Sequence, residues 1–422
     1  MVRTFLSSFR VPEIRKKLAF TAAILLLYRV GAYIPAPGIN VDAVKDISDN
    51  FSGSNVLGFL NLFSGGSLQR FAIFALGIMP YITASIILQL MTVVVPSLEK
   101  LRKEGEVGQQ KITQYTRYLT VGLAFGQSIG YVFLFRSFST GGADVVENFT
   151  FGRVFVIVTT LTAGCVVLMW FGELITQRGI GNGISLMIFA SIVAGLPNGV
   201  QRWYESPDAV FQVLMPFLCI AIIAAIVYIQ EGQRRIPVQY AKRVVGRRMS
   251  GGGSTYLPLR VNMAGVIPVI FAASLMAFPP TIGELSQASW ARDFSAFFSP
   301  NGWAYIAGES IFIILFTYFY TAVTFNPVEQ ADNLKKYGGF IPGVRPGRPT
   351  AEYLDRILAR LTFPGALYLA AVAAIPTIIV NQTSANFLFA GTSILIVVGV
   401  ALDTMKQLEA QLMMRNYEGF LK

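Results

Sequence analysis

The chain has 422 residues, of which 54% are hydrophobic and only 14% are charged. This balance excludes an ordinary soluble globular protein and predicts a polytopic membrane protein. Histidine is absent, and the two cysteines, Cys165 and Cys219, stand apart inside apolar runs. We therefore expect no metal, no disulfide and no haem or thiol chemistry. The net charge of +11 has to be weighed by position, because charge in membrane proteins first reflects topology.

The N-terminal segment combines basic and apolar side chains. Residues 1–17 predict an amphipathic helix on the cytoplasmic face, with a solvated tail as the alternative. Arg15, Lys16 and Lys17 precede the apolar run LAFTAAILLLY, which has the form of a signal peptide. Arg29 interrupts the apolar run and no small-residue cleavage site closes it, so we expect a retained first span.

Ten apolar windows follow along the chain and predict ten transmembrane helices. They cover residues 18–34, 71–95, 116–136, 154–173, 184–200, 210–230, 262–282, 304–325, 363–381 and 387–404. With the N-terminus in the cytoplasm, 27 Lys and Arg residues fall on cytoplasmic segments and 6 on outer segments. The positive-inside rule therefore places both termini in the cytoplasm, with basic loops at 231–261 and 326–362 and a tail at 405–422.

The ten spans divide into two sets of five. Because five is odd, halves that share a fold would cross the membrane in opposite directions. We expect an N-terminal half at 18–200 and a C-terminal half at 201–404, although the two show no clear residue-level repeat.

The stretch from Val56 to Val95 is too long for one crossing and is broken by Ser-Gly-Gly-Ser at 64–67. Val56–Phe63 makes about two helical turns, or roughly 12 Å, whereas Phe71–Val95 is long enough to span. The short piece has three possible places: facing lipid, folded into the protein interior, or inserted into a cavity as a stopper.

The spans hold almost no interior Asp, Glu or Lys, so we expect no catalytic residues and no cofactor. Gly179–Gly183 (GIGNG) predicts a tight connection between spans, because a nucleotide site would need a βαβ context. A secondary transporter is an alternative, although its usual midplane carboxylates and paired broken helices are not evident. A structural membrane scaffold is a third hypothesis.

Isolated polar residues mark two kinds of candidate site. Gln89, Gln127 and Asn262 could make interhelical hydrogen bonds worth about 0.6–2 kcal/mol, weak enough for a gate to open. The basic loops could attract RNA or an acidic protein face, or they could reflect topology and lipid headgroups alone. Arg345 stands between Gly and Pro residues in GGFIPGVRPG, where we expect an exposed docking residue.

Six motifs resemble the SecY family and lie in the family's order over nearly the whole chain. They are FSGGSLQRFAIFALGIMPYITASIILQL, EGEVGQQKITQYTRY, ITQRGIGNGISL, VNMAGVIPVIFA, FNPVEQADNLKKYGGFIPGVRPG and GTSILIVVGVALD. The resemblance implies an all-α polytopic protein of the bacterial cytoplasmic membrane, with ten transmembrane helices in two inverted five-helix halves around an hourglass pore. It also implies a short re-entrant plug helix and a lateral gate between spans 2 and 7.

The function implied by the resemblance is that of a protein-conducting channel. It would pass unfolded secretory polypeptides across the membrane and release hydrophobic segments laterally into the bilayer. The implied partners are SecE, SecG, SecA, the ribosome, signal-sequence-bearing preproteins and anionic lipids, with SecDF and YidC as further candidates. The chain would itself be a passive channel, with ATP hydrolysis supplied by SecA.

Site residues carry over from the family motifs position by position. The implied pore ring is Ile78, Ile82, Ile184, Ile188, Ile270 and Ile396. The implied plug is Leu57, Gly58, Phe59, Leu60, Asn61, Leu62, Phe63, Ser64, Gly65 and Gly66. The lateral gate would use Gln89, Gln127 and Asn262, and docking of SecA or the ribosome would use Arg247, Arg248 and Arg345. A collar of apolar side chains can expel water when empty, but ordinary helix packing explains the same isoleucines. Gly58 stands where many relatives have a larger or charged residue, so a weaker plug helix is expected.

Overall fold

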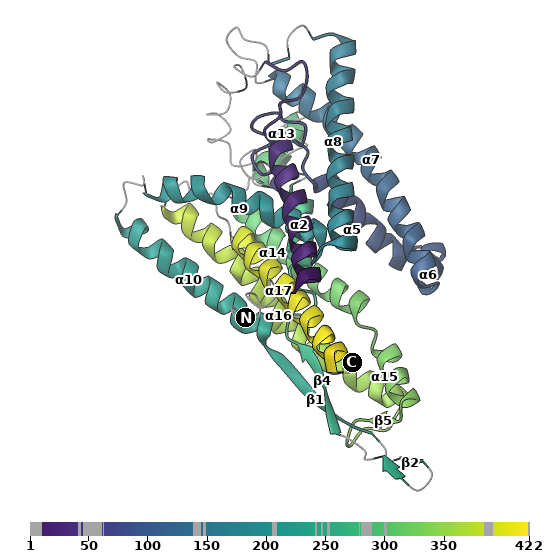
Figure 1. Cartoon of the computed structure of the whole chain (residues 1–422). Coiled ribbons are helices and arrows are strands. Elements are labelled where there is room, and N and C mark those ends of the chain that lie inside the picture. The colour runs from purple at the N-terminus through teal and green to yellow at the C-terminus, as the bar shows by residue number, and fades with distance from the viewer. Residues whose placement is uncertain are drawn as a thin grey trace.

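The structure is a computed structural model of the whole chain, and the residues that it describes are 11–40, 44, 61, 63–137, 145–146, 149–204, 209–240, 243–245, 248–250, 254–277, 279, 289–298, 302–383 and 391–420. Within these ranges the chain is mostly helical (Figure 1). Residues 1–10 of the predicted N-terminal helix, plug residues 57–60 and 62, and Arg247 lie outside the described residues.

Each of the ten apolar windows contains a helix. These helices are α2 (Pro12–Gly31), α5 (Met79–Val94), α7 (Glu106–Ser137), α8 (Phe151–Arg178), α9 (Gly183–Tyr204), α10 (Ala209–Glu231), α11 (Ile267–Met276), α14 (Trp303–Thr324), α16 (Arg348–Thr383) and α17 (Gly391–Phe420). Among the described residues, the connecting segments contain three further helices: α6 (Pro96–Lys103), α13 (Ser289–Phe297) and α15 (Pro327–Lys336).

Length and hydropathy alone mark fewer of these helices as membrane spans. Within the described residues, five segments qualify: Phe151–Arg178, Gly183–Gln201, Trp303–Lys336, Arg348–Ile379 and Gly391–Met414. A sixth is α5 taken with α6, which follows it at a 97° bend. Helix α11 has only 10 residues, or roughly 15 Å, which is half the thickness of a bilayer core.

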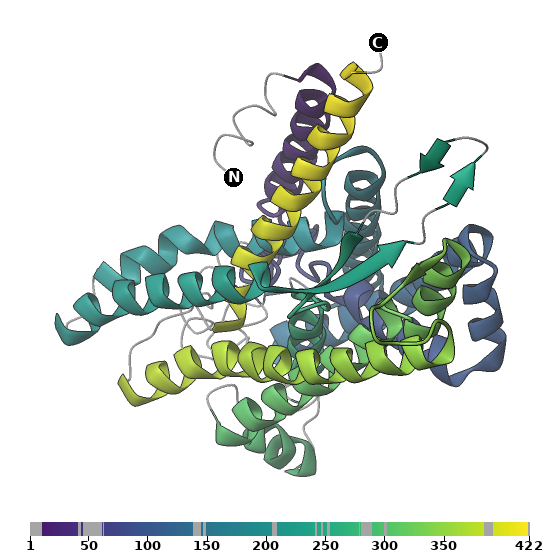
Figure 2. The same ribbon diagram turned by 90° about the horizontal axis from the view of Figure 1, so that it is seen from below.

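The first helix begins earlier than the sequence predicts. Helix α2 runs unbroken from Pro12, so residues 12–17, predicted to belong to a separate amphipathic helix, are the first turns of the spanning helix. Proline at the first helical position has no amide hydrogen to leave unpaired. Ile14 is buried against Leu408 of α17, and Lys17 donates a hydrogen bond to Gln411 of α17. Figure 2 shows these two helices side by side, and their packing explains the continuous helix.

The second span starts later than predicted. The window 71–95 becomes helical only at Met79, and the residues before it form successive turns. Phe71 and Gly77 both have positive φ angles, 46° and 57°, and a right-handed helix cannot contain such residues. Helix α5 therefore has 16 residues, or about 24 Å, and the turns ahead of it pack Phe71 edge-on against Phe135 of α7.

The two basic loops at 231–261 and 326–362, both predicted to be cytoplasmic, contribute strands to one small β-sheet. The expectation of an all-α protein missed this sheet. Strand β1 (Gln233–Tyr240) pairs antiparallel with β4 (Ser254–Arg260) and with β5 (Gly339–Phe340). A separate hairpin joins β2 (Arg243–Val245) to β3 (Arg248–Ser250). Ile236 and Val238 of β1 are buried against Leu354 of α16. The sheet thus connects loops that are about a hundred residues apart, at one end of the helices (Figure 1).

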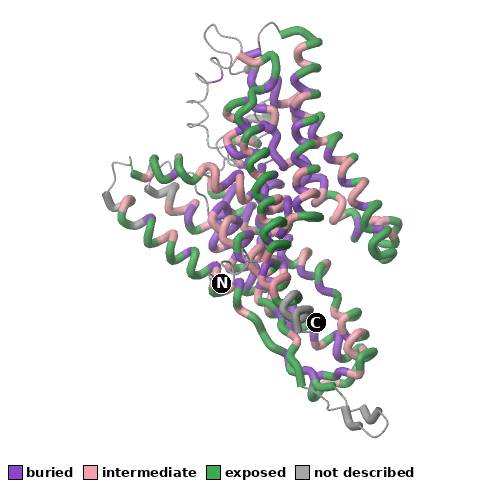
Figure 3. Tube along the Cα trace, in the orientation of Figure 1, coloured by how far each residue is buried: buried purple, intermediate pink, exposed green. Residues whose placement is uncertain are grey.

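Buried residues follow the centre of the helical body (Figure 3). The central apolar cluster draws on α2, α5, α8, α9, α10, α11, α14, α16 and α17. The connection from α8 to α9 is tight, as predicted for GIGNG: it occupies four residues, and the Gly183 amide donates a 2.9 Å hydrogen bond to Thr176 Oγ1. This connection brings the start of α9 into the core.

Candidate functional site

All six isoleucines predicted for the pore ring lie in or against the central apolar cluster. Five of them are buried and Ile184 is half-buried. They come from α5 and the residue before it, α9, α11 and α17: Ile78, Ile82, Ile184, Ile188, Ile270 and Ile396. The cluster holds many other apolar side chains, so the ring itself stays a prediction. Its convergence from four distant segments is a property of the tertiary structure.

Gly172 of α8 has no side chain, and this lets two of the six isoleucines, Ile78 and Ile184, pack closely against the helix. A Cβ atom at Gly172 would lie 3.3 Å from Ile184 Cγ1 and 3.7 Å from Ile78 Cδ1. The bare backbone of α8 therefore contacts two of the predicted ring residues, one from α9 and one from the turn before α5. Sequence reasoning missed Gly172 because a lone glycine in an apolar helix carries no signal of its own.

The described end of the predicted plug is a hydrogen-bonded turn at residues 64–66, called the plug hinge below. The Gly66 amide and Ser64 Oγ both donate to the Asn61 carbonyl, at 3.0 and 3.1 Å. The Leu68 amide donates to Ser64 Oγ at 3.1 Å. Gly65 and Gly66 have positive φ angles of 66° and 84°, which glycine adopts without strain. The hinge is therefore an ordered structure.

Three residues that sequence reasoning did not select hold the plug hinge from outside. Tyr28 Oη donates to the Ser64 carbonyl at 3.2 Å and lies 2.5 Å from Ser191 Oγ. Arg29 Nη1 donates to the Gly65 carbonyl at 2.6 Å. The one available signal was Arg29, a charged residue inside the first apolar window, since charges at membrane depth usually have a partner or a function.

The helices of the predicted lateral gate, α5 and α11, pack against each other. Ser274 of α11 makes a 3.9 Å hydrogen bond to the sulfur of Met79 at the start of α5. The three amides are not joined: the Gln89 side chain bonds to Ser85 on its own helix, and the Asn262 side chain donates to the Gly265 carbonyl. In the described part of the chain, no hydrogen bond connects Gln89, Asn262 and Gln127 with one another.

The predicted docking residues belong to the β-domain, the name used here for the two loops that carry strands β1 to β5. Arg345 is exposed on a turn between Gly343 and Gly347, whose φ angles are 83° and 102°. Thr350 Oγ1 donates to the Arg345 carbonyl at 2.8 Å and fixes the turn. Arg248 begins β3. The exposure of Arg345 agrees with the sequence prediction, and its docking role stays a prediction.

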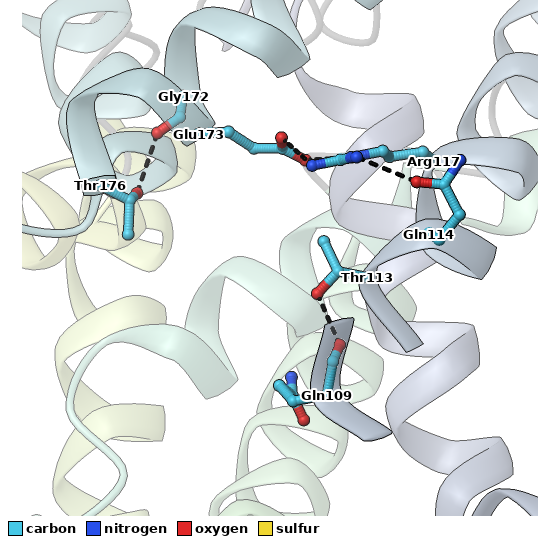
Figure 4. Close-up of polar contacts among 7 residues, drawn as sticks. All are labelled: Gln109, Thr113, Gln114, Arg117, Gly172, Glu173 and Thr176. Atoms are coloured by element: carbon cyan, nitrogen blue, oxygen red, sulfur yellow. Dashed lines mark hydrogen bonds and ion pairs between the residues drawn. The ribbon is translucent and has the colours of Figure 1, made fainter. Parts of the chain in front are cut away.

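An ion pair between α7 and α8 was also missed. Arg117 Nε donates to Glu173 Oε1 at 2.8 Å, and Nη2 donates to Oε2. The third guanidinium nitrogen donates to Gln114 at 2.9 Å. Figure 4 shows these contacts beside Thr176, one turn after Gly172. Both residues sit at the edges of their apolar windows, where charges are common, so nothing in the sequence paired them.

Comparison with known proteins places the chain in a family. The family model SecY matches residues 72–405. The chain belongs to the SecY family. The Protein translocase subunit SecY of Mycobacterium tuberculosis strain H37Rv is 48% identical over the full length of both chains. The subunit of the same name from Streptomyces griseus is 50% identical, again over both full lengths.

Solved structures agree on the SecY-type fold. One, described as the structure of a protein conducting channel, has a TM-score of 0.61 and 19% sequence identity over 96% of both chains. Sec61 in the canine ribosome-channel complex has a TM-score of 0.58 and 17% identity, with the same coverage. At such low identity these matches support the fold alone, namely a polytopic helical fold.

Proposed function

We propose that this chain forms the membrane channel of a protein translocase. Unfolded polypeptides cross through it, and hydrophobic segments leave it sideways into the bilayer. The observation that carries the proposal is the convergence of six isoleucines from four segments on one buried cluster, in a chain of the SecY family. Branched apolar side chains can surround a passing peptide without binding its polar groups, and they can expel water when the channel is empty.

The lateral exit lies between α5 and α11 in this proposal. Their hydrogen-bond contact through Ser274 and Met79 is long and involves a weak sulfur acceptor. Gln89 Oε1 and Asn262 Oδ1 are buried without a hydrogen-bond partner among the described residues. A buried carbonyl oxygen without a partner destabilises the closed arrangement. Both amides can therefore gain a hydrogen bond when the helices rearrange, which supports their role in the gate.

Partners supply the driving force. In the proposed complex the chain associates with SecE and SecG in the bacterial cytoplasmic membrane, with both termini in the cytoplasm. SecA or a translating ribosome drives the polypeptide, and SecA hydrolyses the ATP. The exposed guanidinium of Arg345 and the basic strands of the β-domain support such docking, because arginine suits acidic protein faces and RNA phosphates.

Crosslinking tests the position of the ring. In a background with Cys165→Ala and Cys219→Ala, a single cysteine replaces Ile82 or Ile270, and the complex with SecE, SecG and SecA is reconstituted into vesicles. We expect both cysteines to crosslink to a preprotein stalled during transport. The matched control is Ile157→Cys, because Ile157 is equally buried, at 1% exposure, but belongs to the cluster between α7 and α8.

Two outcomes would contradict the proposal. If the crosslinks at position 157 are as strong as those at positions 82 and 270, the assignment of Ile82 and Ile270 to the pore ring is wrong. Saturable uptake of a small solute without SecA, in vesicles that transport no preprotein, would replace the channel with a secondary transporter.

A further inference from the structure

We propose that Tyr28, Arg29 and Ser191 form a latch that holds the plug hinge, residues 64–66, in the closed channel and releases it reversibly. The inference rests on the proposed channel function and adds positioning residues to it. Tyr28 and Arg29 belong to the end of α2 and Ser191 belongs to α9. The latch therefore ties the plug hinge to two helices that are far apart in the sequence.

Tyr28 provides a bond that can be exchanged. Its hydroxyl is buried, lies 3.2 Å from the Ser64 carbonyl and 2.5 Å from Ser191 Oγ, and has one proton. Ser191 Oγ in turn lies 2.9 Å from the Met187 carbonyl of its own helix. In the latched arrangement Ser191 donates to Tyr28, and Tyr28 donates to Ser64, because a hydroxyl both donates and accepts.

The same groups remain paired after the hinge leaves. Ser191 can then donate to the Met187 carbonyl, and Tyr28 can donate to Ser191 Oγ. Release therefore leaves neither buried hydroxyl without a partner, although an unpaired buried donor would oppose opening. This exchange makes the latch reversible, since the hydroxyl protons only reorient while the helices stay in place.

Arg29 provides the charged part of the latch. Its 2.6 Å hydrogen bond to the Gly65 carbonyl is charge-assisted and hence stronger than a neutral one. Tyr33 holds the guanidinium in place: its hydroxyl accepts from Nη2 at 3.0 Å, and its ring lies 4.9 Å from the guanidinium carbon. Arg29 forms no ion pair within the described part of the chain, so a backbone carbonyl of the hinge is a principal partner of this charge.

Close packing explains why the hinge needs glycine at its centre. A Cβ atom at Gly65 would lie 2.9 Å from Tyr28 Oη and 3.3 Å from the Ser191 backbone. On the other side, a Cβ atom at Gly77 would lie 3.3 Å from Ser64 Cα. The hinge thus sits between the latch and the turn that precedes Ile78 of the predicted ring. A movement of the hinge would therefore take place next to the predicted ring.

Removal of one hydroxyl tests the latch. Tyr28→Phe keeps the aromatic ring, which stacks on Phe74 at 6.0 Å, and removes both hydrogen bonds. The matched control is Tyr131→Phe, because Tyr131 is also buried at 8% exposure but lies on α7, in a different apolar cluster from Tyr28. Each variant, in complex with SecE and SecG, is measured in planar bilayers for resting ion conductance, and in vesicles with SecA for preprotein transport.

We expect Tyr28→Phe to raise resting conductance about tenfold, because it removes the Tyr28–Ser64 hydrogen bond, which exists only in the latched arrangement, and one such bond shifts a two-state equilibrium by roughly that factor. Ser191→Ala should instead lower it, because Tyr28 keeps its bond to Ser64 in the latched arrangement but has no partner after release. The double variant should conduct no more than Tyr28→Phe alone, because the two side chains share one bond. Tyr131→Phe should match the wild type. A purely structural role for Tyr28 would lower thermal stability without changing resting conductance.

The latch is overturned if Tyr28→Phe and Ser191→Ala conduct like Tyr131→Phe in preparations that transport preprotein normally. If Tyr28→Phe does not fold, Ser191→Ala alone decides. Wild-type vesicles that transport no preprotein would instead contradict the channel function, and this result is separate from the conductance comparison.

Discussion

The ion pair between Arg117 and Glu173 joins two of the long helices, α7 and α8. It is bidentate, and the side chains are only 37% and 14% exposed. A shielded bidentate pair is held more firmly than an exposed pair, which water and salt screen. Glu173 directly follows Gly172, whose backbone contacts Ile78 and Ile184. The pair therefore fixes the part of α8 that supports the predicted ring.

Glu173→Gln should lower the free energy of unfolding by about 1–3 kcal/mol, because it leaves the Arg117 guanidinium without its charged partner. Thermal or denaturant unfolding of the complex in lipid nanodiscs measures this loss. The double variant Arg117→Gln with Glu173→Gln should lose less than the sum of the two single variants.

The exposed pair of Lys103 and Glu99 on α6 is the control for this cycle. Its side chains are 73% and 49% exposed, so Lys103→Gln should leave stability unchanged. Strictly additive losses for Arg117 and Glu173 would show that the two side chains do not stabilise each other.

At the scale of elements, the start of α5 depends on backbone geometry. Gly77 has a φ of 57° and ends the series of turns two residues before the helix begins at Met79. The turns carry the plug hinge, and the helix carries Ile82 and Gln89. One glycine in a left-handed conformation thus separates the predicted plug from the residues of the predicted ring and gate.

Gly77→Ala should destabilise the protein by roughly 1–2 kcal/mol, because an L-residue is strained at this φ and its Cβ atom would crowd Ser64. The matched control is Gly122→Ala in α7, where a Cβ atom would meet nothing within 4 Å. That change should be neutral or stabilise the helix by up to ~1 kcal/mol. Unfolding of both variants in nanodiscs is the measurement, and equal effects would contradict the proposed role of Gly77.

At the scale of the whole molecule, the β-sheet joins two loops that the sequence presents as separate. Strand β1 bonds to β4 of its own loop and to β5 of the other. The sheet packs on α16 through Ile236, Val238 and Leu354. A partner that docks on Arg345 therefore contacts a folded platform anchored to a helix of the channel, and its binding can be transmitted to the membrane part.

Arg345→Glu should reduce SecA-dependent preprotein export by about tenfold, the effect of losing roughly 1.4 kcal/mol at an interface. Ribosome-coupled insertion of a membrane protein should fall less. Arg348→Glu is the neighbouring control, because Arg348 is also exposed and pairs with Glu352 one turn later. Equal losses for both variants, or in both assays, would remove the special role of Arg345.

The sequence by itself determined the class of the protein, the ten apolar windows and the family motifs. Apolar runs, the distribution of charge and the positions of glycine residues are local properties of the sequence. Each residue's preference for lipid, for the protein interior or for water depends mainly on its own side chain. The exposed turn at Arg345 followed from its glycine and proline neighbours, whereas the six isoleucines followed from the resemblance to the motifs of the SecY family. The sequence did not predict that α5 begins only at Met79. The late start depends on the left-handed conformation of Gly77, and the φ of a glycine depends on what packs beside it.

Only the tertiary structure decided which residues meet. The bonds of Tyr28 and Arg29 to the plug hinge, the bond between Tyr28 and Ser191, the pair of Arg117 with Glu173, and the sheet between two loops all join segments separated by dozens of residues. The sequence around one partner does not indicate which residue the other partner is, because hydrogen bonds and ion pairs depend on distances that only folding sets. The apolar character of the predicted pore lining is thus a local property of the sequence, whereas the contacts around it arise from the fold.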